Sequence, residues 1–145
     1  MAYAICADTP GGVEVLEWRD IPTPKPGPGQ VVIHQTKVGL NFIDVYMTSG
    51  TYPFPETGPQ IPGGEAAGIV AEVGSGVSEL CVGDRVAYTT PNGAYREQRV
   101  MAADRLVKLP DGVSDEVAAA SMLKGMTVEY LLNRSFKVKP DQKVL

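Results

Sequence analysis

Residues 62–77 read PGGEAAGIVAEVGSGV, and this stretch indicates a mainly β fold. It begins with glycines and alanines around one acid, Glu65, and small residues allow a backbone to approach another segment or a ligand closely. A strand over 67–73 follows, and the turn at 74–76 ends it. A solitary buried Glu65 would need hydrogen-bonding partners. The stretch is not a phosphate loop, because neither GxGxxG nor GxxxxGK[ST] occurs in the sequence.

Further short strands are expected along the first two-thirds of the chain, separated by turns rich in Gly and Pro. They span residues 3–7, 13–18, 30–38, 84–89, 93–100 and 105–109. Strands of this length and spacing favour a closed or nearly closed barrel.

Helical periodicity begins near residue 113. Ser114 is the expected N-cap, and Asp115 and Glu116 place negative charge in the first turn. Gly125 fits the C-terminus of this helix. A second helical piece is expected over 126–134, where apolar residues recur at helical spacing.

The last residues, KPDQKVL, read as a polar turn that leads into a buried strand at Val144-Leu145. We therefore expect the chain to be a fragment of a longer protein. The alternative is a natural C-terminus on an edge strand.

Composition narrows the classes of function. The 145 residues carry a net charge of −4, with basic residues scattered singly, so nucleic acid is not an expected partner. No run approaches the ~20 apolar residues of a membrane span, and the N-terminus lacks the pattern of a signal peptide. A cytoplasmic protein without membrane association is expected, with Cys6 and Cys81 as reduced thiols.

Residues 38–53, VGLNFIDVYMTSGTYP, place polar and aromatic side chains where a pocket could form. Asn41 fits a helix N-cap and Asp44 the third helical position of a capping box, with Gly50 just past the helix end. This explanation needs no function, but it leaves the tyrosines unexplained. Core packing is the alternative for Tyr46, whereas Tyr52 falls in a Pro-rich loop, and loops often carry sites.

Six motifs, taken in order, resemble the medium-chain dehydrogenase/reductase superfamily and, within it, the zinc-free NADPH:quinone oxidoreductases. The motifs are VGLNFIDVYMTSGTYP, PGGEAAGIVAEVGSGV, VGDRVAY, GAYREQRV, LPDGVSDEVAAASMLKGMTVEYLL and KPDQKVL. VGDRV is shared across the superfamily, whereas NFID with YPFP and MLKGMTVEYLL are more specific to the quinone reductases.

The resemblance implies a partly open, GroES-like β-barrel followed by C-terminal helices. Residues 1–125 would form the GroES-like catalytic domain, without its C-terminal completion. Residues 126–145 would form a linker helix and the start of a Rossmann nucleotide-binding domain that lies beyond this chain. The full-length protein is expected to be a homodimer.

Departures from the zinc-dependent branch of the superfamily point to catalysis without a metal. In that branch a cysteine ligand matches Asn41 and a histidine ligand matches Gly64. A catalytic zinc needs about three protein ligands. The four-cysteine lobe of those enzymes is absent as well, since residues 84–95 run directly from one strand to the next.

The resemblance implies hydride transfer from NADPH to a quinone or another conjugated carbonyl compound. Tyr46, Tyr52 and Asn41 are the expected catalytic residues, because the phenols offer a flat surface and an O–H and the amide is a neutral donor and acceptor. Lys124 and Thr127, with Asn41, would face the cofactor. A cation at a helix C-terminus and the N-cap of the next helix explain Lys124 and Thr127 equally well.

Asp44, Gly64 and Glu65 are expected to support the site rather than to react. Two other functions stay open. One is an NADPH-dependent enone or enoyl reductase of the same superfamily. The other, of a different class, is a free-standing GroES-like module that binds a partner and does no chemistry.

Overall fold

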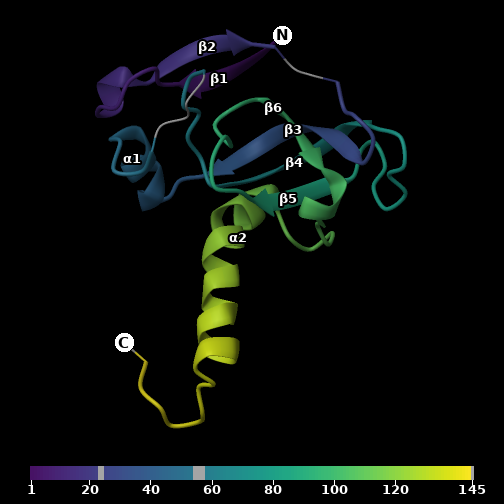
Figure 1. Ribbon diagram of the computed structural model, residues 1–145. Helices are drawn as coiled ribbons and strands as arrows, with labels where there is room; N and C mark the ends of the chain where they lie inside the picture. Colours follow the sequence, from purple (N-terminus) through teal and green to yellow (C-terminus); the bar gives the residue numbers. More distant parts are fainter. Residues whose placement is uncertain (23–24, 54–57, 145) are drawn as a thin grey trace.

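Two antiparallel sheets form the body of the protein in this computed structural model, which describes residues 1–22, 25–53 and 58–144 (Figure 1). One sheet has five strands in the order β6-β3-β4-β5-β7, and the other pairs β1 with β2. The strands are β1 (Ala2–Cys6), β2 (Glu17–Ile21), β3 (Gln30–Gly39), β4 (Glu65–Val73), β5 (Arg85–Thr89), β6 (Gln98–Ala102) and β7 (Val107–Lys108). The helical elements are η1 (Val13–Val15), α1 (Phe42–Thr48), η2 (Ala103–Arg105), α2 (Asp115–Glu129) and the π-helical turn η3 (Tyr130–Ser135).

An irregular segment, residues 95–97, joins the two sheets. The Ile5 amide of β1 donates to the Tyr95 carbonyl at 2.8 Å, and the Gln35 amide of β3 donates to the Glu97 carbonyl at 2.8 Å. These bonds link the sheets, although the strands of the described residues do not close into a continuous barrel. The expected mainly β fold with C-terminal helices is therefore confirmed in a partly open form, whereas a closed barrel is not formed by the described strands.

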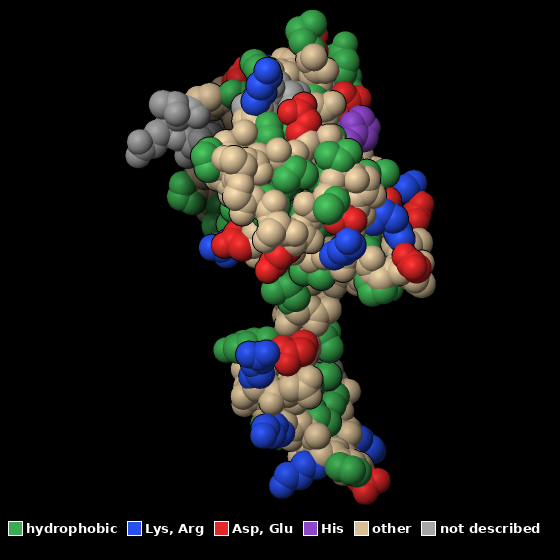
Figure 2. All heavy atoms as spheres, turned by 90° about the vertical axis from the view of Figure 1, so that its right-hand side faces the viewer, with side chains coloured by type: hydrophobic (Ala, Val, Ile, Leu, Met, Phe, Trp, Pro, Cys, Tyr) green, Lys and Arg blue, Asp and Glu red, His purple; other side chains and the backbone are tan. Residues whose placement is uncertain are grey.

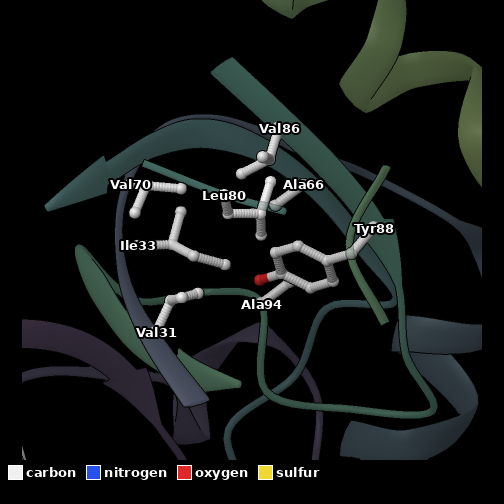
Figure 3. Packing of buried hydrophobic residues seen from close by; sticks show 8 residues of the cluster. All are labelled: Val31, Ile33, Ala66, Val70, Leu80, Val86, Tyr88 and Ala94. Carbon is white, nitrogen blue, oxygen red and sulfur yellow. The ribbon is translucent and has the colours of Figure 1, made fainter. Parts of the chain in front are cut away.

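The core lies on the inner face of the five-stranded sheet (Figure 3). Successive residues of a strand point to opposite faces, so Val31 and Ile33 of β3 enter the same cluster. Its buried members are Val31, Ile33, Ala66, Val70, Leu80, Val86, Tyr88 and Ala94.

Helix α2 packs on the other side of β3, β4 and β5 through very small residues. Ala118 and Ala119 of the helix contact Ala67 and Ala87 of the sheet. At Gly39 an added Cβ would lie 2.2 Å from the Ala119 carbonyl oxygen. This close approach explains why the last residue of β3 is glycine, and it brings α2 next to the start of β4.

Most expected strands are present, and two are corrected. Residues 13–18 are not one strand, because the Val15 amide turns back to the Gly12 carbonyl and forms η1 before β2 begins at Glu17. The strand expected over 93–100 begins only at Gln98, since the residues before it turn between the sheets.

Both helix starts are confirmed, and one helix end is wrong. Asn41 and Ser114 are the N-caps of α1 and α2. Helix α2 does not stop at Gly125 but continues to Glu129. Glycine lowers helix propensity by about 1 kcal/mol, which backbone bonding on both sides outweighs here. The separate helix expected over 126–134 is therefore the end of α2 together with η3.

The C-terminal part of α2 projects from the body (Figures 1 and 2). Since α2 runs unbroken past residues 125 and 126, no turn marks the domain boundary expected there, and that boundary stays a prediction. Basic and acidic side chains are interspersed on the face shown in Figure 2. Among the described residues, no helix has the length and apolar character needed to span a bilayer. The strand expected at Val144-Leu145 is untested, because Leu145 lies outside the described residues.

Candidate active site

The centre of the site is the carboxylate of Glu65, the first residue of β4, whose exposed fraction is 0%. The Asn41 amide nitrogen donates to Oε1 at 2.8 Å and the Lys124 ammonium donates to the same oxygen at 2.7 Å. The backbone N–H of Leu123 donates to Oε2 at 2.7 Å. The start of α1 and the middle of α2 therefore meet at one buried acid of β4.

The hydrogen bonds keep Glu65 ionised despite its burial. Burial alone would raise the pKa of this carboxyl group, but the hydrogen bonds from Lys124, Leu123 and Asn41 outweigh it, so the pKa lies below its ordinary value. Lys124 is about half exposed, with 53% of its side chain accessible. One of its N–H groups faces Glu65, which leaves an ammonium group with further donors at the surface of the cluster.

Asp44 fixes the first turn of α1. Its Oδ2 accepts from the Asn41 backbone N–H at 2.9 Å, the bond expected for the acid of a capping box. The same oxygen accepts from the Tyr95 hydroxyl at 2.9 Å. The Asn41 side-chain amide donates to Glu65, so Asn41 joins the helix N-terminus to the buried acid.

Tyr46 and Tyr52 form an aromatic pair beside α1. Their ring centroids lie 6.4 Å apart with the planes tilted by 53°, and the exposed fractions are 42% and 45%. Gly50, at φ +78°, turns the chain so that the Tyr52 amide donates to the Tyr46 carbonyl at 3.3 Å. Core packing, the alternative for Tyr46, is wrong because its ring is exposed.

A hollow of about 330 Å³ lies between α1, β5 and α2. Gly64 and Leu123 line it from the two sides of the Glu65 cluster, and Ile43 lines it from α1. A Cβ on Gly64 would meet only ordinary contacts, the nearest at 3.6 Å. Gly64 therefore shapes this wall without being sterically required there.

Thr127 lies one turn beyond Lys124 on α2. Its hydroxyl donates to the Leu123 carbonyl at 2.8 Å, within the same helix. Lys124 was explained as a cation at a helix C-terminus and Thr127 as the N-cap of the next helix. Both explanations are wrong, because both residues lie inside α2.

The donor chemistry does not favour a cation site. In the described part of the chain, no three His, Cys, Asp or Glu side chains gather closely enough to hold a metal ion. At the Glu65 cluster the neighbours of the acid are an amide, an ammonium and a backbone N–H, all of which are donors.

The structure thus brings Asn41, Glu65 and Lys124 together directly, with Asp44 and Gly64 next to them. Two members of this arrangement were not anticipated from the sequence. The Leu123 N–H carries no side-chain signal at all. Tyr95 lies in the motif GAYREQRV, but its partner Asp44 is distant in sequence, and only the fold brings them into contact.

The partly open barrel and the buried acid at its junction with α2 define a class of protein. Residues 27–111, more than half of the chain, match the protein family described as "Alcohol dehydrogenase GroES-like domain". The chain belongs to this family.

Individual relatives narrow the class. The chain is 50% identical over 136 residues, 93% of its length, to a protein of Pseudomonas aeruginosa named quinone oxidoreductase. It is 41% identical, over its whole length, to a 2-haloacrylate reductase of Burkholderia sp.. Among solved structures, the Escherichia coli quinone oxidoreductase complexed with NADPH matches 97% of the chain with 40% identity and a TM-score of 0.88. The resemblance to quinone oxidoreductases of the medium-chain dehydrogenase/reductase superfamily is confirmed.

The chain is much shorter than these relatives. It spans 42% of the Pseudomonas protein, 45% of the Burkholderia protein and 43% of the solved Escherichia coli chain.

Proposed function

We propose that this chain forms the catalytic-domain part of an oxidoreductase that transfers hydride from NADPH to a quinone without a metal. The observation that carries the proposal is the Glu65 cluster, which joins α2 to the start of α1 beside a hollow. Helix α1 also carries Tyr46 of the Tyr46–Tyr52 pair. The names of the relatives support the same reaction.

The choice of a quinone follows from the donors at the site. Alcohol oxidation must stabilise an alkoxide, whose conjugate acid has a pKa near the ~15.7 of water, and a metal is the usual means. Reducing a quinone leaves a phenolate-like oxygen, comparable to a tyrosine of pKa about 10. The gap of roughly six units is on the order of 8 kcal/mol, so neutral donors and water are sufficient for a quinone.

Metal independence is supported by the residue types at two positions. Asn41 and Gly64 stand where the zinc-dependent branch has a cysteine and a histidine. The Asn41 amide donates to Glu65, so a metal ion at this position would meet a donor N–H rather than a lone pair.

The aromatic pair would receive the acceptor. Tyr46 and Tyr52 present exposed rings against which a flat ring can stack, and each carries an O–H that can donate to a developing oxyanion. Hydride transfer adds two electrons and one proton, and a second proton from water completes the hydroquinone. Asp44 and Glu65 support this arrangement by holding Asn41 in place.

The residues at the junction with α2 fit an anionic nucleotide cofactor. Lys124 offers an ammonium group that Glu65 only partly occupies, and Asn41 has one further amide N–H. When bound, NADPH would supply the hydride. The Thr127 hydroxyl donates to the Leu123 carbonyl, so toward the cofactor it can accept a hydrogen bond but can donate only after releasing that carbonyl. We therefore place Thr127 at the edge of the cofactor site.

A second candidate function is reduction of an activated carbon–carbon double bond, as in an enone or enoyl reductase. The relative named 2-haloacrylate reductase favours it. Turnover of quinone and enone substrates by the intact protein, measured side by side, separates the two. A free-standing binding module is the third possibility, and it predicts no turnover with either substrate.

The remaining features of the proposal concern the whole protein. We propose that it acts as a homodimer in the cytoplasm, on a small-molecule substrate. Cys6, which is buried, and Cys81, which is exposed, are both free thiols.

The tyrosines provide the test of this proposal. Replacing Tyr52 or Tyr46 by Phe in the intact protein should lower kcat with quinone roughly tenfold or more, because an oxyanion donor is lost. Tyr3→Phe is the matched control, since Tyr3 is an exposed tyrosine of β1 that stacks on Trp18 of β2, in the two-stranded sheet. If kcat with quinone were unchanged in both Tyr46→Phe and Tyr52→Phe, neither tyrosine would take part in the mechanism.

A further inference from the structure

Polar anchors hold α1 in place. The apolar side chains Phe42 and Val45 of this helix are 72% and 56% exposed. Its buried residues are instead Asp44 and Thr48. Ile43 and Met47 are only partly buried, so the orientation of this short helix depends in large part on the hydrogen bonds that Asp44 and the helix end make.

Tyr95 is the anchor of Asp44 from outside the helix. The backbone of Tyr95 is fixed on both sides, since its amide donates to the Pro62 carbonyl at 2.9 Å and its carbonyl accepts from the Ile5 amide at 2.8 Å. From this fixed backbone the Tyr95 hydroxyl reaches Asp44 Oδ2 at 2.9 Å. The Tyr95 side chain therefore connects the segment that joins the two sheets to the N-terminal turn of α1.

The neighbouring loop has a conformation that admits the Tyr95 ring. Gly63 has φ +104°, and a Cβ there would lie 2.4 Å from Tyr95 Cδ1. Only glycine fits beside the ring in this conformation. The first part of the motif PGGEAAG therefore accommodates Tyr95, and its acid, Glu65, belongs to the site.

The hydroxyl of Tyr95 remains a donor throughout the physiological range. Burial raises the pKa of this phenol, and the hydrogen bond to Asp44 and its negative charge raise it further. The bond from Tyr95 to Asp44 begins a connected series that continues through Asn41 and Glu65 to Lys124.

We infer that Tyr95 is a positioning residue of the hydride-transfer site and that it acts through Asp44 on the first turn of α1. Asn41 is the N-cap of this helix, and Tyr46 lies further along it. This inference rests on the proposed function. Tyr95 does not touch the reacting atoms in this scheme. Its hydroxyl sets where the amide and the aromatic ring of α1 stand relative to Glu65 and Lys124.

The variant Tyr95→Phe in the intact protein removes only the hydroxyl. Tyr88→Phe is the control, because it removes the same hydroxyl from a buried tyrosine that donates to Gln35 of β3 and not to α1, whereas Tyr95 is partly buried. Hydrogen exchange, read on the peptide covering residues 40–48, should be faster in Tyr95→Phe than in Tyr88→Phe. Equal exchange in the two variants would overturn the inference, whatever the enzyme does.

Steady-state kinetics give the second readout. We expect Tyr95→Phe to lower kcat with quinone roughly three- to tenfold, with the KM for NADPH nearly unchanged, because misplacement affects the acceptor side of the site. A kcat equal to that of Tyr88→Phe would overturn the role of Tyr95. If the wild-type protein itself shows no quinone turnover, the proposed function fails, and the exchange experiment still decides whether Tyr95 anchors α1.

Discussion

At the scale of single residues, Glu65 determines the site. It is fully buried yet ionised, and its oxygens accept from Asn41, Leu123 and Lys124. The sequence indicated that a solitary buried Glu65 would need partners, but it singled out Asn41 and Lys124 as residues facing the cofactor and not as those partners. It could not reveal the Leu123 amide, because every non-proline residue carries the same backbone N–H.

Replacing Glu65 by Gln should destabilise the protein. The new amide would place an N–H group against donors, and Lys124 would lose its counter-charge. We expect the free energy of unfolding to fall by about 1–3 kcal/mol, measured by urea denaturation of the intact protein. Glu79→Gln, at an exposed position, is the control and should change stability little. An equal effect of the two changes would contradict the role given to the Glu65 cluster.

The same carboxylate predicts a dependence of stability on pH. The folded state lowers the pKa of Glu65 below its ordinary 4.5, so its contribution is complete above that value and is lost as pH falls through the lower, folded pKa. The difference in unfolding free energy between wild type and Glu65→Gln should therefore narrow as pH falls below the ordinary pKa of 4.5. A difference that stays constant or widens on acidification would show that Glu65 is not preferentially ionised in the fold.

At the scale of elements, helix starts were more predictable than helix ends. Asn41 and Ser114 predicted the starts of α1 and α2, because N-capping depends on one side chain and the backbone next to it. Gly125 gave a wrong end for α2, since the effect of glycine depends on what surrounds it. The strand expected over 13–18 failed for a similar reason, because local bonding to Gly12 favours the 3-10 turn.

The contact between α2 and β3 should be sensitive to a single methyl group. Gly39→Ala would place a Cβ 2.2 Å from the Ala119 carbonyl, so the helix must shift away from the sheet. We expect this variant to lower the Tm of the intact protein by several degrees. Gly125→Ala is the same chemical change within α2, where no atom lies within 4 Å of the added Cβ, and it should not lower Tm. Equal Tm values for the two variants would refute the close packing at Gly39.

At the scale of the whole molecule, the chain contains only part of the expected machinery. The barrel, the Glu65 cluster and the tyrosine pair are present, whereas no GxGxxG motif occurs in the sequence. The fold class was predictable from motifs, which also singled out Asn41, Glu65 and Lys124, three residues that the fold brings into contact. The contact between Tyr95 and Asp44 was not, because it depends on how the two sheets are joined.

Because the sequence lacks the GxGxxG nucleotide motif, we expect the 145-residue chain alone to bind the cofactor weakly. We expect titration calorimetry of the 145-residue chain with NADPH to give no binding in the sub-micromolar range, because the main nucleotide motif is not in this sequence. The intact protein is the control and should bind NADPH more tightly. Tight binding by the chain alone would mean that the cofactor site lies within the barrel and α2.

The proposed reaction is hydride transfer to a quinone without a metal. The most direct measurement is NADPH oxidation by the intact protein with a quinone acceptor, before and after dialysis against a chelator, with the metal content of each sample determined. We expect quinone-dependent oxidation at the same rate in the metal-depleted protein. Activity that disappears on chelation and returns with zinc, or no quinone turnover in either sample, would contradict it.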